Sequence, residues 1–345
     1  MQDKRTQGGF CVSTIAPTLA APEADTPLQS VSPRFILAIY AVIPLALLFI
    51  AVDYLLFDFR LNALLPNTPA DMGWLNVFFM LPHVVASVLT FADREYLVSY
   101  SGRLVGSSLA FVAGIVLVPA LFGVAMMVLL LALYTAYHQV AQQTGIASIV
   151  ARHRSPLNTA WKWLCMVVLV AVFLASLVEA DLRQKMYAAA PLLYVTLISA
   201  VFGALVVVGA LVARQSRTTT GRLLVGANTG MILMQGVFFA LGLHFFMILI
   251  PRLVHDITAF GFYITHNMNR NRGVPHNVVV RAFQPTRLPE YLLTPAIALG
   301  VSVALSQLVP REFLVFIVAF LALFHYYWEG VMWKNGAPHR QFIRV

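Results

Sequence analysis

Long apolar stretches recur along nearly the whole chain, and they limit the folds that are open to it. About ten of them approach the length of roughly 20 residues that an α-helix needs to cross the hydrocarbon core of a bilayer. Short charged or Pro/Gly-rich breaks separate them. Because 60% of the 345 residues are hydrophobic and only 11% are charged, little polar surface is left for a water-soluble domain. The sequence therefore predicts an all-α protein, a polytopic bundle of transmembrane helices.

The breaks between apolar stretches predict ten spans. They cover residues 34–57, 72–91, 103–119, 121–143, 159–180, 187–213, 223–250, 252–267, 290–309 and 311–333. At Pro119 and Pro251 two spans are joined by almost no loop, so eight or nine spans are the alternatives. Residues 1–33 are rich in Thr, Ser, Pro and Ala, which predicts a disordered cytoplasmic tail. Residues 34–345 are expected to form a single integral-membrane domain.

The distribution of basic residues predicts an orientation. With the N-terminus inside, eighteen of the 23 Lys and Arg residues lie on the cytoplasmic side, and the other five are Arg60, Arg183, Lys185, Arg252 and Arg311. This asymmetry follows the positive-inside rule, so both termini are expected in the cytoplasm and the protein in a bacterial-type inner (plasma) membrane. Loop charges of this kind also explain the net charge of +9 without nucleic acid as a partner. Arg270 is assigned the same orienting role.

Six histidines stand in or at the ends of the predicted spans, and five of them are candidate ligands, whereas His244 is assigned to packing or to the membrane interface. Burying even one imidazole in hydrocarbon is costly, so several of them imply a shared purpose. Two are followed four residues later by a carboxamide or a carboxylate on the same helical face, Gln142 in one case and Glu329 in the other, and His83 shares its face with Ser87. Imidazoles combined with carboxylates are ligands for iron, zinc, copper or manganese. The predicted ligands are His83, His138, His255, His266, His325, Glu329, Asp93 and Asp256, with Gln142 in an outer layer.

Two of these histidines lie far apart on one predicted helix. His255 and His266 are separated by about 16 Å along the axis, at a rise of about 1.5 Å per residue. A compact site that holds both therefore requires a broken or re-entrant helix. His83, His138, His266 and His325 are expected in the cytoplasmic half of the membrane, and His255 lies farther out.

With these residues the chain loosely resembles the histidine-rich integral-membrane oxygenases, hydroxylases and desaturases, whose non-haem iron lies at the cytoplasmic ends of transmembrane helices. The sequence has neither the HxxxH nor the HxxHH boxes of those families, so no individual ligand position is carried over. The resemblance implies a metal-dependent oxidoreductase with iron, expected as a dinuclear centre, and with copper, zinc or manganese as alternatives. It also implies a lipid or another hydrophobic substrate, which would reach the site from the surrounding membrane lipids.

Two tyrosines near the proposed site, Tyr263 and Tyr326, are expected to donate hydrogen bonds to bound oxygen. Electrons would come from a separate protein, because the sequence has no Gly-rich dinucleotide motif and no CxxCH haem attachment. Two other functions use the same residues: a haem-b cytochrome with two axial histidines, and a proton-coupled transporter. His153, His276 and His339 fall in predicted loops, where solvated side chains are expected.

Overall fold

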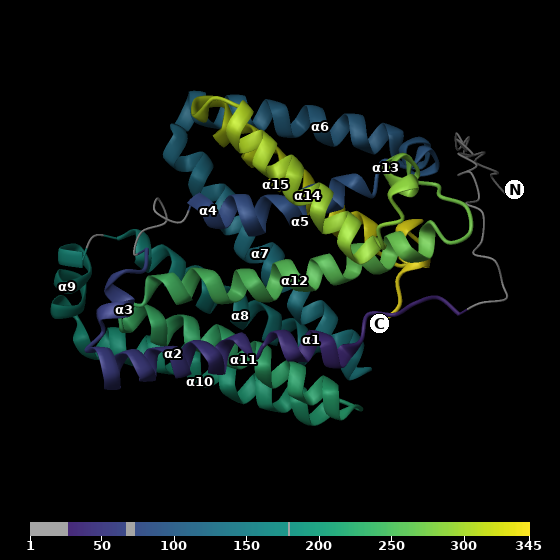
Figure 1. Cartoon of the computed structure of the whole chain (residues 1–345). Helices are drawn as coiled ribbons and strands as arrows, with labels where there is room; N and C mark the ends of the chain where they lie inside the picture. The colour runs from purple at the N-terminus through teal and green to yellow at the C-terminus, as the bar shows by residue number, and fades with distance from the viewer. Residues whose placement is uncertain (1–26, 67–72, 179) are drawn as a thin grey trace, which may run out of the picture.

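The structure is a computed structural model that describes residues 27–66, 73–178 and 180–345 (Figure 1). Within these ranges the chain forms helices and no β-strand. In chain order the elements are α1 (Pro33–Ile39), α2 (Val42–Phe57), α3 (Arg60–Ala63), α4 (Gly73–Leu75), the π-helix η1 (Asn76–Met80), α5 (Leu81–Leu89), α6 (Arg94–Phe122), α7 (Val124–Ala151), α8 (Pro156–Leu177), α9 (Ala180–Ala189), α10 (Pro191–Gln215), α11 (Thr219–Ala240), α12 (His244–Arg270), α13 (Val278–Phe283), the 3-10 helix η2 (Gln284–Thr286), α14 (Glu290–Leu308), α15 (Arg311–Met332) and the 3-10 helix η3 (His339–Phe342).

Among the described residues, nine helical segments are long and apolar enough to cross a membrane. They are α1 with α2, and then α6, α7, α8, α10, α11, α12, α14 and the α15 segment. The multi-pass helical architecture is therefore confirmed, whereas the orientation of the termini stays a prediction. The span predicted at 72–91 is shorter than expected and composite, with an apolar helical part at Val77–Leu89. Pro82 has no N–H to donate, and the turn before it is wound as a π-helix.

Two of the predicted breaks lie elsewhere in the structure. Pro119 is inside α6 and Pro251 is inside α12. The chain instead breaks at Gly123, with φ of +83°, and around Gly242, with φ of +72°. Glycine adopts these left-handed values without the steric penalty of a side chain, so it ends a helix where proline merely interrupts the hydrogen bonding. Proline was thus the wrong signal for the ends of these helices.

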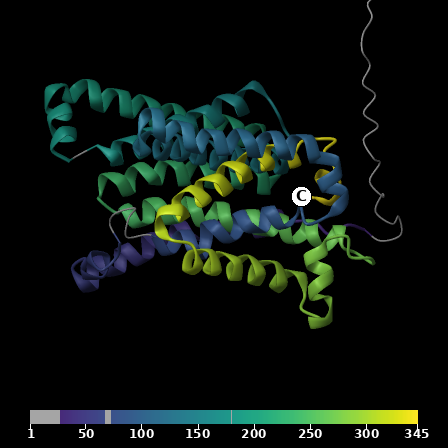
Figure 2. The same ribbon diagram turned by 90° about the horizontal axis from the view of Figure 1, so that it is seen from above.

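Helix α12 lies at the centre of the bundle. It contacts α1, α2, α5, α7, α11 and α14, and its side chains include many of the buried polar residues. Figure 1 shows α6, α14 and α15 on one side of α12 and α8, α10 and α11 on the other. The view turned by 90° in Figure 2 shows that the long helices run roughly along a common direction, as expected for a bundle that spans a bilayer.

The first described residues pack against the end of the chain. The backbone N–H of Val31 donates to the carbonyl of Arg344 at 2.9 Å, and Gln29 exchanges two hydrogen bonds with the side chain of Asn269 on α12. Gln29 and Val31 of the predicted tail therefore have hydrogen-bond partners in the folded chain. The remainder of that predicted tail, residues 1–26, lies outside the described residues.

Helices α7 and α11 approach each other closely at one glycine. A Cβ atom placed on Gly221 would lie 2.4 Å from the Cα of Ala151. Such a distance is far inside van der Waals contact, so this crossing requires a residue without a side chain. The close approach fixes the position of α7, which carries one of the histidines of the site.

Candidate metal centre

Four helices that are distant in sequence bring four imidazoles together. His83 comes from α5, His138 from α7, His255 from α12 and His325 from α15, and all four are buried. The ring centroid of His83 lies 5.1 Å from that of His255 and 4.8 Å from that of His325. The ring centroid of His138 lies 4.9 Å from that of His255 and 5.0 Å from that of His325. Each ring therefore neighbours two others in a closed arrangement, the four-histidine cluster.

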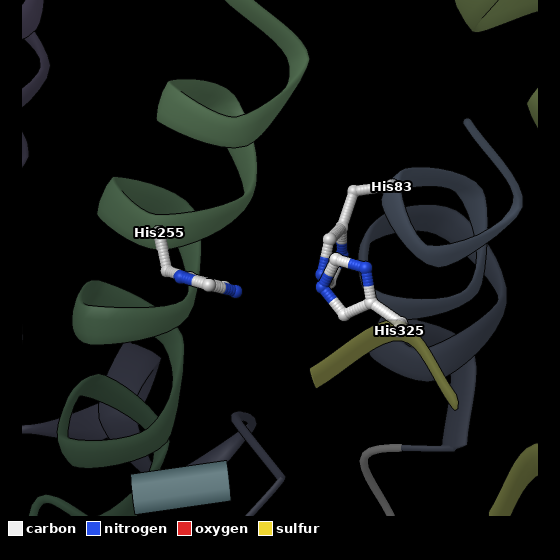
Figure 3. A group of neighbouring side chains, drawn as sticks. All are labelled: His83, His255 and His325. Carbon is white, nitrogen blue, oxygen red and sulfur yellow. The ribbon is translucent and has the colours of Figure 1, made fainter. Parts of the chain in front are cut away.

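Figure 3 shows three members of this cluster. The ring of His255 points from α12 across to His83 and His325, whose rings lie close together. Potential ligand atoms of these three residues all lie within 4.8 Å of one another. The same holds for a second group, His138, His325 and Glu329. Both groups have the spacing of side chains around a metal ion, and they share His325.

Hydrogen bonds fix the tautomers of two of the rings. Nδ1 of His325 lies 2.8 Å from Oγ of Ser87, and this hydroxyl already donates its own proton to the carbonyl of Val84. Ser87 must therefore accept, which places the proton of His325 on Nδ1. Nδ1 of His83 faces two acceptors, the carbonyl of Phe79 at 3.3 Å and Oδ1 of Asp256 at 3.0 Å. In both rings the lone pair is consequently on Nε2.

Five further ring nitrogens of the cluster have no hydrogen-bond partner among the described residues. They are Nε2 of His83, Nε2 of His138, both nitrogens of His255 and Nε2 of His325. Nε2 of His138 does lie 3.3 Å from Oε2 of Glu329, but the contact is not aligned as a hydrogen bond. Native proteins rarely leave one buried polar atom unpaired, because each costs about 1–3 kcal/mol. Five such atoms in one cluster indicate a missing common partner.

Glu329 is held in place beside the cluster by its neighbours. The hydroxyl of Tyr263 donates to Oε1 of Glu329, and Nε2 of Gln142 approaches both carboxylate oxygens at 3.3 and 3.4 Å. These contacts orient the carboxylate so that Oε2 faces His138. Gln142 therefore contacts the Glu329 carboxylate, and its role in an outer layer around a metal stays a prediction.

A second carboxylate lies behind His83. Asp256 is buried, and its oxygens have no aligned hydrogen bond among the described residues, although Nδ1 of His83 is 3.0 Å away. Its nearest permanent cation is Arg252, whose Nε is 3.9 Å from Oδ2. Of the two buried carboxylates, Asp256 has this one distant arginine, and Glu329 has no Lys or Arg ion-pair partner among the described residues. Buried charges of this kind need compensation, and a cation bound by the imidazoles would supply it.

The two predicted tyrosines lie at the site, but their hydroxyl protons have protein acceptors. Tyr263 donates to Glu329. Tyr326 stacks on His138 with 4.4 Å between ring centroids, and its hydroxyl lies 2.9 Å from Oγ1 of Thr135. Because Thr135 donates its own proton to the carbonyl of Leu131, Tyr326 is the donor in that pair. In this structure Tyr263 orients Glu329 and Tyr326 packs against His138, and the predicted hydrogen bonds to oxygen would require both tyrosines to change partners.

His266 and Asp93 lie in a different cluster. His266 accepts or shares a hydrogen bond with the hydroxyl of Tyr96 at 3.0 Å and stacks on His339 at 5.0 Å. Asp93 caps α6 by accepting from the N–H of Glu95, and it also accepts from Nε of Arg270 at 2.7 Å. The reason is that α12 is continuous through His255 and His266, so the helical rise separates the two histidines. The predicted single site with both of them does not form.

His339 and Arg270 are also placed differently from the prediction. His339 is fully buried, not solvated, because the end of the chain folds back and stacks this ring on Tyr96 at 3.7 Å. Burial lowers the pKa of the His339 imidazole well below its usual value, and the neighbouring His266 and Arg270 lower the pKa further. Arg270 is buried in ion pairs with Asp93 and Glu95, so it does more than orient the helix.

Two groups that hold the imidazoles had no such role assigned from the sequence, the hydroxyl of Ser87 and the carbonyl of Phe79. Ser87 lies four residues after His83, so the spacing places both on one face of α5. The hydroxyl, however, contacts His325 of another helix, and this pairing depends on how α5 and α15 pack. Backbone carbonyls such as that of Phe79 leave no signal in the sequence.

The fold and the site together define a multi-pass helical membrane protein with a buried cluster of four histidines and a carboxylate. No protein-family model matches the chain, and no curated protein or solved structure shows significant similarity to it. The function is therefore inferred from the site alone.

Proposed function

We propose that the protein is an integral-membrane, metal-dependent oxidoreductase that uses iron and acts on a hydrophobic substrate. The observation that carries the proposal is the set of five unpaired imidazole nitrogens in the four-histidine cluster. Two of the rings donate their other N–H to an oxygen, His325 to the hydroxyl of Ser87 and His83 to the carbonyl of Phe79, which is the usual support of a metal-bound histidine. Copper, zinc and manganese use similar ligands and are distinguished by metal analysis.

The ligand count favours one ion over the dinuclear centre expected from the resemblance. A neutral imidazole with one protonated nitrogen offers a single lone pair, so His325 binds one ion only. Four histidines and Glu329 then provide five donors, which suit one ion better than two. The group of His138, His325 and Glu329 has the composition of the two-histidine, one-carboxylate triad that non-haem iron oxygenases use.

Within this proposal each residue has a defined task. The iron would supply the one-electron chemistry that dioxygen requires. The hydroxyl of Ser87 and the carbonyl of Phe79 accept ring protons on the side away from the ion, Tyr263 and Gln142 fix the Glu329 carboxylate, and the buried surroundings exclude water. If the reaction is a hydroxylation, substrate and dioxygen with two electrons and two protons give a hydroxylated product and water. The two electrons would come from the separate donor protein predicted from the sequence.

The arrangement of the rings speaks against a haem. Two axial imidazoles stand on opposite faces of a flat macrocycle. Here each ring has two neighbours at 4.8–5.1 Å, so the other pair of rings occupies the space that the macrocycle would need. We expect the purified protein to lack a Soret band.

The test is reconstitution of the purified protein with ferrous iron, followed by iron analysis and measurement of dioxygen consumption with a chemical reductant and extracted membrane lipid. His255→Ala removes a ring with two unpaired nitrogens, and His266→Ala on the same helix is the matched control. We expect about one iron per chain in wild type and in His266→Ala, and a loss of iron and oxygen consumption in His255→Ala. Equal iron in all three proteins, or iron without oxygen consumption, would contradict the proposal.

A further inference from the structure

A cavity of about 380 Å³ lies against one side of the four-histidine cluster. Met80, Thr135 and Arg252 line it, and each stands three residues before the histidine of its own chain segment. Helix α15 contributes Val318, about two turns before its histidine. The cavity therefore lies on the N-terminal side of all four rings. Its volume is within the range of small-molecule sites, about 300–1,000 Å³.

The walls of this cavity are connected to the proposed ligands. Thr135 accepts the hydroxyl proton of Tyr326, whose ring stacks on His138. Arg252 approaches Asp256, which in turn contacts His83. A molecule in the cavity would thus lie one helical turn from the metal centre, beside the residues that orient it.

The cavity opens toward the outside of the bundle between α7 and α15. Val128 of α7 and Val315 of α15 both line it, and they are 50% and 42% exposed. Other lining residues, such as Leu169 and Phe173 of α8, are apolar. In a membrane this opening would face lipid tails, so an apolar molecule could enter without crossing water.

Two polar groups interrupt the apolar lining. Gln235 of α11 is fully buried, and its Nε2 donates to the carbonyl of Met231 at 3.3 Å, which identifies Oε1 as the free acceptor. Neither Oε1 of Gln235 nor Nε of Arg252 has a hydrogen-bond partner among the described residues. One is an acceptor and the other a donor. A hydroxyl group satisfies both, because it donates one hydrogen bond and accepts another.

We propose that this cavity is the substrate site and that it binds an elongated apolar molecule carrying a hydroxyl group, which enters from the bilayer between α7 and α15. The hydroxyl would pair with Gln235 and Arg252, and the apolar part would extend along the wall toward the histidines. The role as substrate site rests on the proposed function, whereas binding itself does not require the metal.

Photolabelling of the full-length protein in lipid nanodiscs tests this directly. The probes are a long-chain primary alcohol and the alkane of the same length, each with a diazirine in its chain, applied after metal removal with a chelator. Ala132→Phe fills the cavity, and Ala125→Phe makes the same change at an exposed position of α7. Gln235→Leu removes the acceptor at similar volume.

We expect the alcohol to label wild type about tenfold more efficiently than the alkane, as one to two added hydrogen bonds imply. Ala132→Phe should reduce labelling by both probes about tenfold, and Ala125→Phe should not. In Gln235→Leu the labelling efficiency of the alcohol should fall toward that of the alkane. Wild-type labelling in Ala132→Phe would overturn the site, and equal labelling of wild type by both probes would overturn the hydroxyl preference.

Mapping the labelled residues in wild type gives a measurement that needs no variant. Labels on the lining residues of α7, α8 and α15 support the site, and labels confined to other surfaces overturn it. A failure of the proposed function can be told apart from a failure of the cavity proposal. If only the proposed function is wrong, the alcohol still labels the cavity of the chelated protein, while the reconstituted protein holds no iron or consumes no dioxygen.

Discussion

Replacing Ser87 by alanine should weaken metal binding without removing any ligand. The hydroxyl accepts from Nδ1 of His325 at 2.8 Å and keeps the lone pair of that ring on Nε2. A neutral hydrogen bond of this kind contributes about 0.5–1.5 kcal/mol net. Loss of an outer partner of a metal-bound histidine typically costs 10- to 100-fold in affinity. We therefore expect about a tenfold weaker affinity, which corresponds to about 1.4 kcal/mol.

The assay is a competition titration of the purified protein with zinc against a chromophoric chelator. Ser302→Ala is the matched control, because Ser302 is equally buried and donates to the carbonyl of Ala298, on a helix that carries no imidazole of the cluster. Ser87→Thr retains a hydroxyl and should recover most of the affinity. Unchanged zinc affinity in Ser87→Ala, or an equal loss in Ser302→Ala, would refute the assignment of Ser87 as the group that orients His325.

Three further predictions concern stability in detergent solution. Gly221→Ala should lower the free energy of unfolding by about 1–3 kcal/mol, because the added Cβ would meet the backbone of α7. Gly226→Ala on the same helix, where a Cβ meets nothing, should be neutral or slightly stabilising. Equal effects of the two substitutions would contradict the close packing. Asp93→Asn should lower the free energy of unfolding by about 3 kcal/mol, because the buried Arg270 keeps only Glu95 as a carboxylate partner among the described residues. The zinc content of this variant should equal that of wild type. A loss of zinc would indicate that Asp93 belongs to the metal site. Burial lowers the pKa of His339, so below about pH 6.5 the unfolded chain binds a proton at this residue that the folded chain does not. The free energy of unfolding should therefore decrease, as the pH is lowered, by up to about 1.4 kcal/mol per pH unit from this residue. Thermal unfolding of His339→Phe should accordingly depend less steeply on pH than that of wild type, and an unchanged slope would be the opposing result.

The sequence could predict the helices because their length and apolar composition are local properties. Nothing local separated a proline that a helix tolerates, such as Pro251, from a glycine that ends one, such as Gly242. The first depends on packing by neighbouring helices, and the second on a positive φ that only the folded chain reveals.

Part of the candidate site was predictable because the spacing of residues along a helix is also a local property. Spacing paired His325 with Glu329 and His138 with Gln142, and the structure brings these residues together. Spacing separated His255 from His266 along one helix but could not show which of the two joins the other histidines, since both have polar neighbours. The burial of His339 follows from the chain folding back over α6 and α12, which is a tertiary event.

The central claim is that imidazoles from separate helices bind one ion, and X-ray absorption spectroscopy of the zinc-loaded protein tests it most directly. We predict a first shell of nitrogen and oxygen at about 2.0–2.1 Å with the outer scattering of several imidazoles. This imidazole contribution should decrease in His255→Ala and remain in His266→Ala. A shell without imidazole scattering, or one that His266→Ala changes as much as His255→Ala does, would contradict the account.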